Sequence, residues 1–249
     1  MKKIGFLSFG HWSAAPGSQA QNASDVLLQS IDLAVAAEEL GADGAYFRVH
    51  HFARQLGSPF PLLSAAAAKT SRIEIGTGVI DMRYENPLYM AEDAGAASNA
   101  TAVWAAQLGM NLQSSTLKTD ETGEPLHIQQ AAQIRAYREA WKEAGHTRAP
   151  RVSVSRSIFA IVNDQDRMYF DGSGESQDHI GMLHGGIRAV FGRSYADEPD
   201  RLVKQLAQDD AIAEADTLLL TVPNQLGVEY NAHVLDAILK YVAPELGWR

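Results

Sequence analysis

The sequence predicts an α/β fold built around a parallel β-sheet. Short apolar segments typical of strands alternate with longer segments of helical periodicity, and the connections between them are short. Such strand–helix–strand connections are almost always right-handed, so continued alternation produces either a barrel or a doubly wound sheet. The chain has 249 residues, and a complete eight-fold barrel needs roughly 250.

The first strand–helix–strand unit carries the clearest pattern. Residues 3–9 form a short apolar run bounded by glycine, which predicts a buried strand. Ser24 can cap the helix that follows, and Gly41 supplies its C-terminal stop. The apolar positions that recur at helical spacing are Leu27, Ile31, Ala34 and Ala37. Residues 45–49 form the next predicted strand.

The alternation breaks just before residue 100. The elements predicted here are a helix over 61–70, a strand over 72–76, a helix over 88–97 and a helix over 100–108. Pro87 can open the second of these helices, and Ser98 can cap the third. No strand is predicted between the last two helices, which is an anomaly in a chain that otherwise alternates.

Alternation resumes in the second half of the chain. The predicted elements are a strand at 110–112, a helix over 126–144, a strand over 152–162, a helix over 197–208, a strand over 217–222 and a last helix marked by Tyr230, Val234, Ile238 and Tyr241. Arg156 falls on the apolar face of the strand over 152–162 and is the exception to its alternation. Residues 163–177, rich in Asp, Gly and Ser, predict a mobile surface loop.

Composition excludes several kinds of site and partner. The chain has no cysteine, so disulfides, thiolate metal sites and cysteine nucleophiles are excluded. A net charge of −9 without a stripe of lysine and arginine argues against a nucleic-acid partner. No apolar stretch reaches the roughly 18 residues that span a bilayer, and the N-terminus lacks the features of a signal peptide. We therefore expect a soluble, cytoplasmic protein with no membrane partner.

Residues able to carry chemistry gather where predicted strands end, which is where ligands bind in parallel α/β folds. His50 and His51 follow the second strand, Gly78 follows the third, and Ser98 and Thr101 occupy a helix N-terminus that favours a phosphate. Each position also has a simpler interpretation as a backbone hydrogen bond, a turn or a helix cap. Adjacent histidines in an extended segment point to opposite faces, so we expect no metal site.

Several segments resemble the luciferase-like flavin-dependent monooxygenases, the bacterial luciferase superfamily. The segment EELGADGAYFRVHHF at 38–52 resembles the opening strand–helix–strand signature of that family. The segments IEIGTGV at 73–79 and SNATAVWAA at 98–106 are similar to its third strand and to the start of its phosphate-binding helix. The resemblance covers most of the chain and is most specific in the first hundred residues. It implies a (β/α)8 TIM-type barrel that occupies residues 1–249 as a single domain.

The resemblance also implies an activity. Members oxidise a small organic substrate with molecular oxygen and reduced FMN, which a flavin reductase supplies. His50 matches the catalytic histidine beside the flavin, Gly78 would let the backbone approach the flavin ring, and Ser98 and Thr101 would bind the FMN phosphate. Hydride transfer with the deazaflavin coenzyme, found in the same superfamily, and flavin binding without turnover stay open as alternatives. Family members are commonly homodimers, and we expect the same here.

The sequence departs from the family pattern in two places. Val49 precedes the histidine pair where bacterial luciferase has a glutamate, so the electrostatic surroundings of His50 differ. Near residues 97–98, one or two central strand–helix units of the barrel are missing, together with the arginine expected to help bind phosphate. A natural short form and an omitted segment both explain this, and the intact flanks favour an omitted segment.

Overall fold

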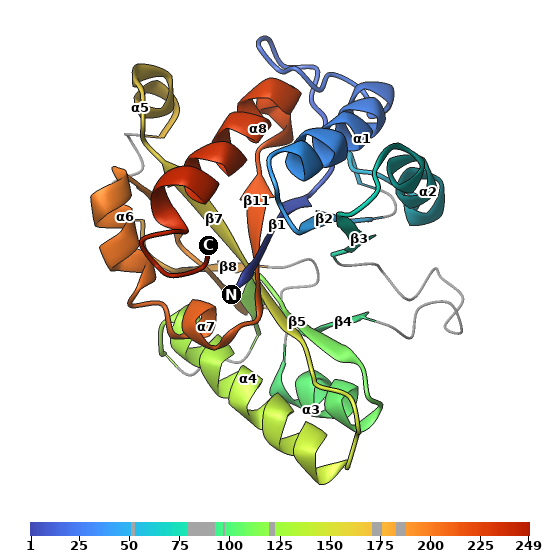
Figure 1. Cartoon of the computed structure of the whole chain (residues 1–249), viewed down its shortest axis with the longest axis vertical. Coiled ribbons are helices and arrows are strands. Elements are labelled where there is room, and N and C mark those ends of the chain that lie inside the picture. The colour runs from blue at the N-terminus through green and yellow to red at the C-terminus, as the bar shows by residue number, and fades with distance from the viewer. Residues whose placement is uncertain (51–52, 79–92, 97, 120–122, 171–175, 183–187) are drawn as a thin grey trace. The chain divides into compact units, whose positions relative to one another are not determined.

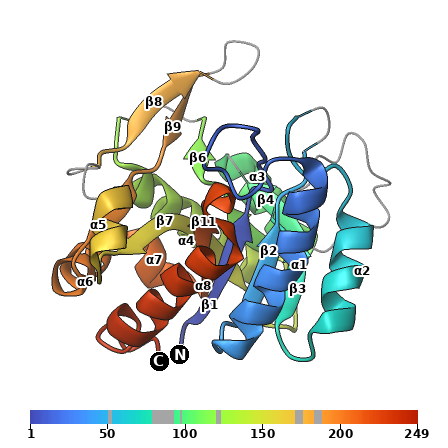
Figure 2. The same cartoon turned by 90° about the horizontal axis from the view of Figure 1, so that it is seen from above.

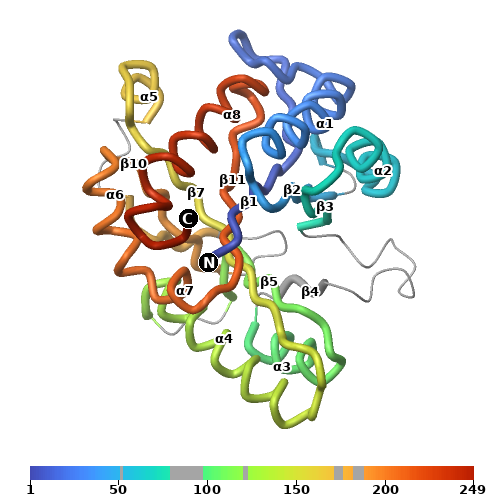
Figure 3. The backbone as a smooth tube through the Cα atoms, viewed as in Figure 1, coloured from blue at the N-terminus to red at the C-terminus, as the bar shows by residue number. Residues whose placement is uncertain are grey.

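The computed structural model describes residues 1–50, 53–78, 93–96, 98–119, 123–170, 176–182 and 188–249 (Figure 1). The chain divides into two compact units: unit 1 contains Met1, Lys3–Pro87 and Leu219–Arg249, and unit 2 contains Lys2 and Leu88–Leu218. The chain leaves unit 1 and later returns to it, so unit 1 combines the N-terminal and C-terminal segments (Figure 3).

Unit 1 is built on strands in the order β3-β2-β1-β11. These strands are β1 (Lys3–Ser8), β2 (Gly44–Phe47), β3 (Glu74–Thr77) and β11 (Thr217–Val222), which enters the unit at Leu219. β1 pairs with β2, and β2 with β3, in parallel, so Ser8, Phe47 and Thr77 end their strands at one edge of the sheet. The pairing is close enough to require glycine at position 5, because a Cβ on Gly5 would lie 2.4 Å from the carbonyl oxygen of Gly44.

Three helices of unit 1 lie side by side on one face of this sheet (Figure 2). They are α1 (Ala23–Glu39), α2 (Pro59–Lys69) and α8 (Gly227–Ala237), which continues as a π-helical turn over Ile238–Val242. α1 contacts both α2 and α8. The helices and strands predicted for the first 78 residues and the last 33 are therefore present, with ends that shift by a few residues.

The start of α1 corrects the sequence analysis, because the N-cap is Asn22 and not Ser24. The side-chain oxygen of Asn22 accepts a hydrogen bond from the backbone N of Asp25 (3.0 Å), and the Asp25 carboxylate accepts one from the backbone N of Asn22 (3.3 Å). This reciprocal pair satisfies two amides that a single serine would not. The buried stripe also differs from the predicted one, since Val26 is fully buried and Leu27 is 38% exposed.

Unit 2 is built on a second set of parallel strands, in the order β4-β5-β7-β10. The strands are β4 (Asp93–Ala96), β5 (Asn111–Ser114), β7 (Val152–Ala160) and β10 (Ser194–Asp197). The helices are α3 (Asn99–Gln107), α4 (Leu126–Glu143), α5 (Asp164–Phe170), α6 (Pro199–Leu206) and α7 (Asp210–Glu214). Parallel strands connected by helices are thus present in both units, as predicted. Within the described ranges, no helix combines the length and the apolar character needed to cross a bilayer.

Strand β4 corrects the anomaly predicted near residue 97. The sequence predicts the end of a helix at 93–96, but these residues pair in parallel with β5, from Asp93 beside Asn111 to Ala96 beside Ser114. Alanine and glycine favour strands poorly, so pairing with β5, and not local preference, decides the structure here. A strand therefore precedes α3 and the alternation is kept. The rest of that helix, 88–92, and residue 97 lie outside the described residues, and the missing units stay a prediction.

A small antiparallel sheet in unit 2 was not predicted. Its order is β6-β9-β8, with β6 at Leu117–Lys118, β8 at His179–Met182 and β9 at Arg188–Phe191. Strands of two to four residues are too short to show a period of two in the sequence. The predicted loop over 163–177 is also partly wrong, because α5 occupies Asp164–Phe170. Residues 171–175 of that loop lie outside the described residues.

Candidate functional site

His50 and Gly78 lie at the edge of the unit 1 sheet where its parallel strands end. The backbone N of Gly78 donates to the carbonyl oxygen of Phe47 (2.9 Å), which extends the pairing of β2 and β3 beyond Thr77. The backbone N of His50 donates to the carbonyl oxygen of Leu56 (3.1 Å) and ties together the two ends of the loop after β2. His50 is half-buried. Its backbone is thus fixed at an edge where ligands gather in parallel α/β folds.

The residues that flank His50 differ from the family pattern. Val49, where bacterial luciferase has a glutamate, is 1% exposed and belongs to the core of unit 1. His51 lies outside the described residues. The residue directly before His50 therefore brings no carboxylate to it, and the nearest charged residue on its N-terminal side is Arg48.

Arg48 belongs to an aromatic cluster at the same edge, which the sequence analysis did not identify. Its backbone N donates to the carbonyl oxygen of Ser8 (2.8 Å), and its guanidinium carbon lies 5.0 Å from the centre of the Phe9 ring, in a cation–π arrangement. The Phe9 ring stacks on the His11 ring with centroids 6.0 Å apart and planes 7° apart. The side-chain amide of Gln55 contacts His11 Nε2 at 3.1 Å. Burial, and then the charge of Arg48, lower the pKa of His11, so its neutral form is favoured.

Ser98 and Thr101 form the N-terminal end of α3 in unit 2, as predicted. Ser98 is the N-cap, and its hydroxyl oxygen accepts a hydrogen bond from the backbone N of Thr101 (3.3 Å). The two hydroxyl oxygens lie 3.0 Å apart, within hydrogen-bonding distance. Ser98 and Thr101 thus share one helix end in unit 2, while His50 and Gly78 share one sheet edge in unit 1.

A buried lysine reaches the start of α3, and the sequence analysis missed it. Lys118 is 1% exposed, and its Nζ donates to Asn99 Oδ1 (3.0 Å) in the first turn of the helix. The same helix end is held by Gln133, whose Nε2 donates to the carbonyl oxygen of Ser98 (2.8 Å) and whose Oε1 accepts from Ser114 Oγ (2.7 Å). In the sequence, a single lysine in a polar segment gives no sign of burial. The burial of Lys118 follows from the fold, in which β6 pairs with β9.

The N-terminus of α4 differs from that of α3 in the groups that surround it. It borders a cavity of about 550 Å³. Asp178 lines this cavity, and its carboxylate accepts hydrogen bonds from the backbone N of Leu126, in the first turn of α4, and from the backbone N of Arg193 (2.9 Å). An internal carboxylate therefore occupies the position where an anion would bind. At the start of α3, by contrast, the contacts of the described residues involve hydroxyls, amides and the ammonium group of Lys118.

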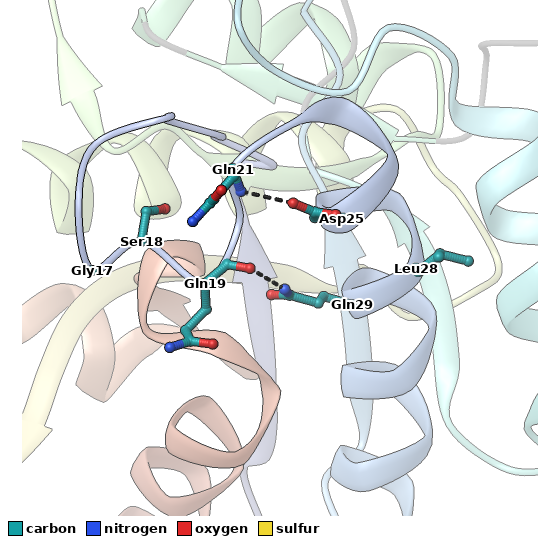
Figure 4. Close-up of a pocket in the computed structure, with 7 residues that line it drawn as sticks. All are labelled: Gly17, Ser18, Gln19, Gln21, Asp25, Leu28 and Gln29. Carbon is teal, nitrogen blue, oxygen red and sulfur yellow. Dashed lines mark hydrogen bonds between the residues drawn. The ribbon is translucent and has the colours of Figure 1, made fainter.

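A second cavity, of about 450 Å³, lies beside the start of α1 in unit 1 (Figure 4). Its polar groups hold the preceding loop on the helix: Gln29 Nε2 donates to the carbonyl oxygen of Gln19 (2.6 Å), and the backbone N of Gln21 donates to the Asp25 carboxylate (3.0 Å). Leu28 points away from these side chains (Figure 4). The arrangement serves the helix cap and offers little chemistry.

Comparison with known sequences gives partial matches. The family model described as luciferase-like monooxygenase matches residues 1–102. An uncharacterized protein of Bacillus subtilis (strain 168), YwcH, is 38% identical over 81 residues, which are 32% of this chain and 24% of YwcH. Limonene 1,2-monooxygenase of Rhodococcus erythropolis is 24% identical over 178 residues, 64% of this chain and 46% of that protein. The chain thus spans about a quarter of the length of YwcH and about half of the length of limonene 1,2-monooxygenase.

Solved structures resemble the chain over nearly its whole length. Monooxygenase RslO1 from Streptomyces bottropensis has a TM-score of 0.71 at 16% identity, covering 97% of this chain and 99% of that one. The oxygenating constituent of 3,6-diketocamphane monooxygenase from Pseudomonas putida, solved with FMN, has a TM-score of 0.63 at 13% identity, covering 99% of each. A coenzyme F420-dependent tetrahydromethanopterin reductase from Methanopyrus kandleri also reaches 0.63, at 11% identity and covering 98% of this chain and 99% of that one.

These comparisons support the predicted fold class and part of the motif resemblance. The structural likeness confirms an α/β fold of the TIM-barrel type. The family resemblance seen in the motifs is confirmed for residues 1–102, which match the model of the luciferase-like monooxygenases.

Proposed function

We propose that the protein is a flavin-dependent monooxygenase that oxidises a small organic substrate with molecular oxygen and reduced FMN, which a separate flavin reductase supplies. The observation that carries the proposal is the set of donors at the start of α3. Ser98 and Thr101 contribute hydroxyls, the first turn contributes backbone amides, and Lys118 contributes a buried positive charge.

This donor set fits a phosphate group. A helix N-terminus favours negative charge, and its free amides point along the helix axis toward a bound anion. The ammonium group of Lys118 donates to Asn99 Oδ1 and so brings a positive charge to the first turn of the helix. Lys118 thereby offers the positive charge that the family's missing arginine would otherwise bring. We assign the FMN phosphate to these residues.

The unit 1 edge supplies the residues for chemistry in this proposal. When bound, reduced FMN supplies the electrons that activate oxygen. The imidazole of His50 can hold or release a proton at that edge. Gly78 has no side chain, and in this proposal that would let a ring system approach the backbone.

The deazaflavin coenzyme is the second candidate. The chain resembles a structure solved with FMN and a coenzyme F420-dependent enzyme equally well, with a TM-score of 0.63 in both cases. The fold therefore does not favour either cofactor. Hydride transfer with a deazaflavin does not consume oxygen, so oxygen consumption separates the two candidates.

The phosphate assignment is tested by titrating the protein with FMN and with riboflavin, which lacks the phosphate, and following flavin fluorescence. We expect Lys118→Met to weaken FMN binding by roughly 10- to 100-fold, the loss typical of a hydrogen bond to a charged group, and to leave riboflavin binding nearly unchanged. Lys142→Met removes an exposed lysine of α4 and is the matched control. Equal losses for both flavins, or for both variants, would contradict the assignment.

The role of His50 is tested by mixing the protein carrying reduced FMN with oxygen and following flavin absorbance near 450 nm. We expect His50→Ala to change the rate of flavin oxidation by about tenfold or more, within the range of general acid–base effects, while FMN affinity stays the same. His127→Ala, at a half-buried histidine of unit 2, controls for nonspecific effects. An unchanged rate in His50→Ala would remove His50 from the chemistry.

A further inference from the structure

The Nε atom of the Arg48 guanidinium is a buried donor without an acceptor among the described residues. The backbone of Arg48 is fixed to Ser8 and its side chain lies over Phe9, so it cannot turn away to solvent freely. A buried N–H of a charged group without an acceptor is unfavourable. Within the described residues, Arg48 therefore keeps a buried donor that a bound acceptor could use.

A second buried polar atom of the same cluster, the side-chain oxygen of Gln55, lacks a hydrogen-bond donor among the described residues. The nitrogen of the same side chain, Gln55 Nε2, contacts the His11 ring. The lowered pKa of His11 keeps that ring neutral, so the positive charge of the cluster rests on Arg48. A molecule that completes the cluster must bring an anionic acceptor for Arg48 and a donor for Gln55.

The remaining surroundings of the cluster are aromatic. Phe9 and His11 present parallel rings, and Trp12 lies nearby in the chain with the guanidinium carbon of Arg54 5.6 Å from its ring centre. Aromatic side chains of this kind favour contact with an aromatic or other apolar body. The cluster lies at the same sheet edge as His50 and Gly78, where the proposed function places the reaction.

We propose that Arg48 binds the carboxylate of the substrate and that Gln55 accepts a hydrogen bond from a hydroxyl next to it, so that the substrate is an apolar hydroxy acid. A guanidinium binds a carboxylate through two parallel N–H donors, which fixes its orientation as well as its charge. The inference rests on the proposed function only where it names this molecule as the substrate. Binding of the acid itself does not require flavin.

The test uses the full chain and four small probes: mandelate, phenylacetate, which lacks the hydroxyl, mandelamide, which lacks the charge, and riboflavin. Affinities for the acids and the amide are measured by ligand-observed NMR, and that for riboflavin by fluorescence. We expect mandelate to bind about tenfold more tightly than mandelamide, and phenylacetate to fall between them. This comparison uses the unaltered protein, so it does not depend on any variant folding.

Variants then assign the site. Arg48→Gln should weaken mandelate by about tenfold and leave mandelamide and riboflavin nearly unchanged, while Arg48→Lys should recover part of the loss. Arg201→Gln makes the same change in charge at an arginine of α6 whose side chain is 71% exposed, and it should have little effect. Equal binding of mandelate and mandelamide, or equal effects of the two glutamine variants, would overturn the proposal. Loss of riboflavin binding in Arg48→Gln would show that Arg48 serves the flavin instead. If mandelate does not bind but FMN and riboflavin do, this proposal fails and the proposed function stands, because the flavins are titrated independently.

Discussion

Arg156 in unit 2 is buried and Arg48 in unit 1 is partly buried, and the surroundings of the two arginines differ. Arg156, on β7, is 5% exposed and binds Asp209 through two hydrogen bonds, Nε to Oδ2 (2.7 Å) and Nη2 to Oδ1 (3.1 Å). The hydroxyl of Tyr195 donates to the same carboxylate (2.8 Å). Arg48 stacks on Phe9, and its buried Nε has no acceptor among the described residues.

The difference separates a charge that serves the fold from one that can serve a ligand. Burying two charges is favourable only when geometry and further hydrogen bonds compensate their lost hydration. Asp209 meets this requirement, since it also caps α7 by accepting from the backbone N of Ile212 (2.9 Å). The network therefore links β7, β10 and α7. Arg48 makes no comparable link within the described part of unit 1, so the fold depends on it much less.

The largest expected effect is a loss of stability when the carboxylate of Asp209 is removed. Asp209→Asn keeps the shape of the side chain but leaves Arg156 with a buried charge and no counter-ion. We expect the free energy of unfolding to fall by about 3–5 kcal/mol, as when one partner of a buried ion pair is removed. Arg48→Gln loses only a cation–π contact and should change it by no more than about 1 kcal/mol. Urea unfolding followed by circular dichroism measures both.

An exposed ion pair supplies the control for this comparison. Arg167 Nη2 lies 3.3 Å from Glu198 Oε1, and their side chains are 48% and 53% exposed. Glu198→Gln should cost roughly 0–1 kcal/mol, because water screens such pairs. If Asp209→Asn were no more destabilising than Glu198→Gln or Arg48→Gln, the buried network would not be structural and the comparison would fail.

The elements that the sequence predicts best are those whose apolar pattern is strong. β11 occupies the predicted residues 217–222 because its run of apolar residues is long enough to be a buried strand and nothing else. β4 could not be predicted, because its pairing with β5 overrides the weak preferences of alanine and glycine. The short strands β8 and β9 depend on each other and carry no pattern of their own.

The same distinction applies to the candidate site. The motifs identify His50, Gly78, Ser98 and Thr101, and the structure places them at a sheet edge and a helix end. Arg156 stood out in the sequence as a charge on an apolar face, but its partner is 53 residues away in the chain, and only the fold reveals it.

The smaller prediction concerns the pH dependence of the buried network. Burial, and then the charge of Asp209, raise the pKa of Tyr195 from its usual 10 to about 12. A folded-state pKa above the unfolded one means that this stabilisation is complete below pH 10 and is lost as the pH rises from 10 to about 12.

Absorbance at 295 nm, as the difference between the unaltered protein and Tyr195→Phe, should show one phenol that titrates near 12. In Asp209→Asn, which lacks the neighbouring negative charge, the pKa of Tyr195 should fall toward its usual value. A phenol titrating near 10 in the unaltered, folded protein would mean that Tyr195 reaches water and is not part of the buried network.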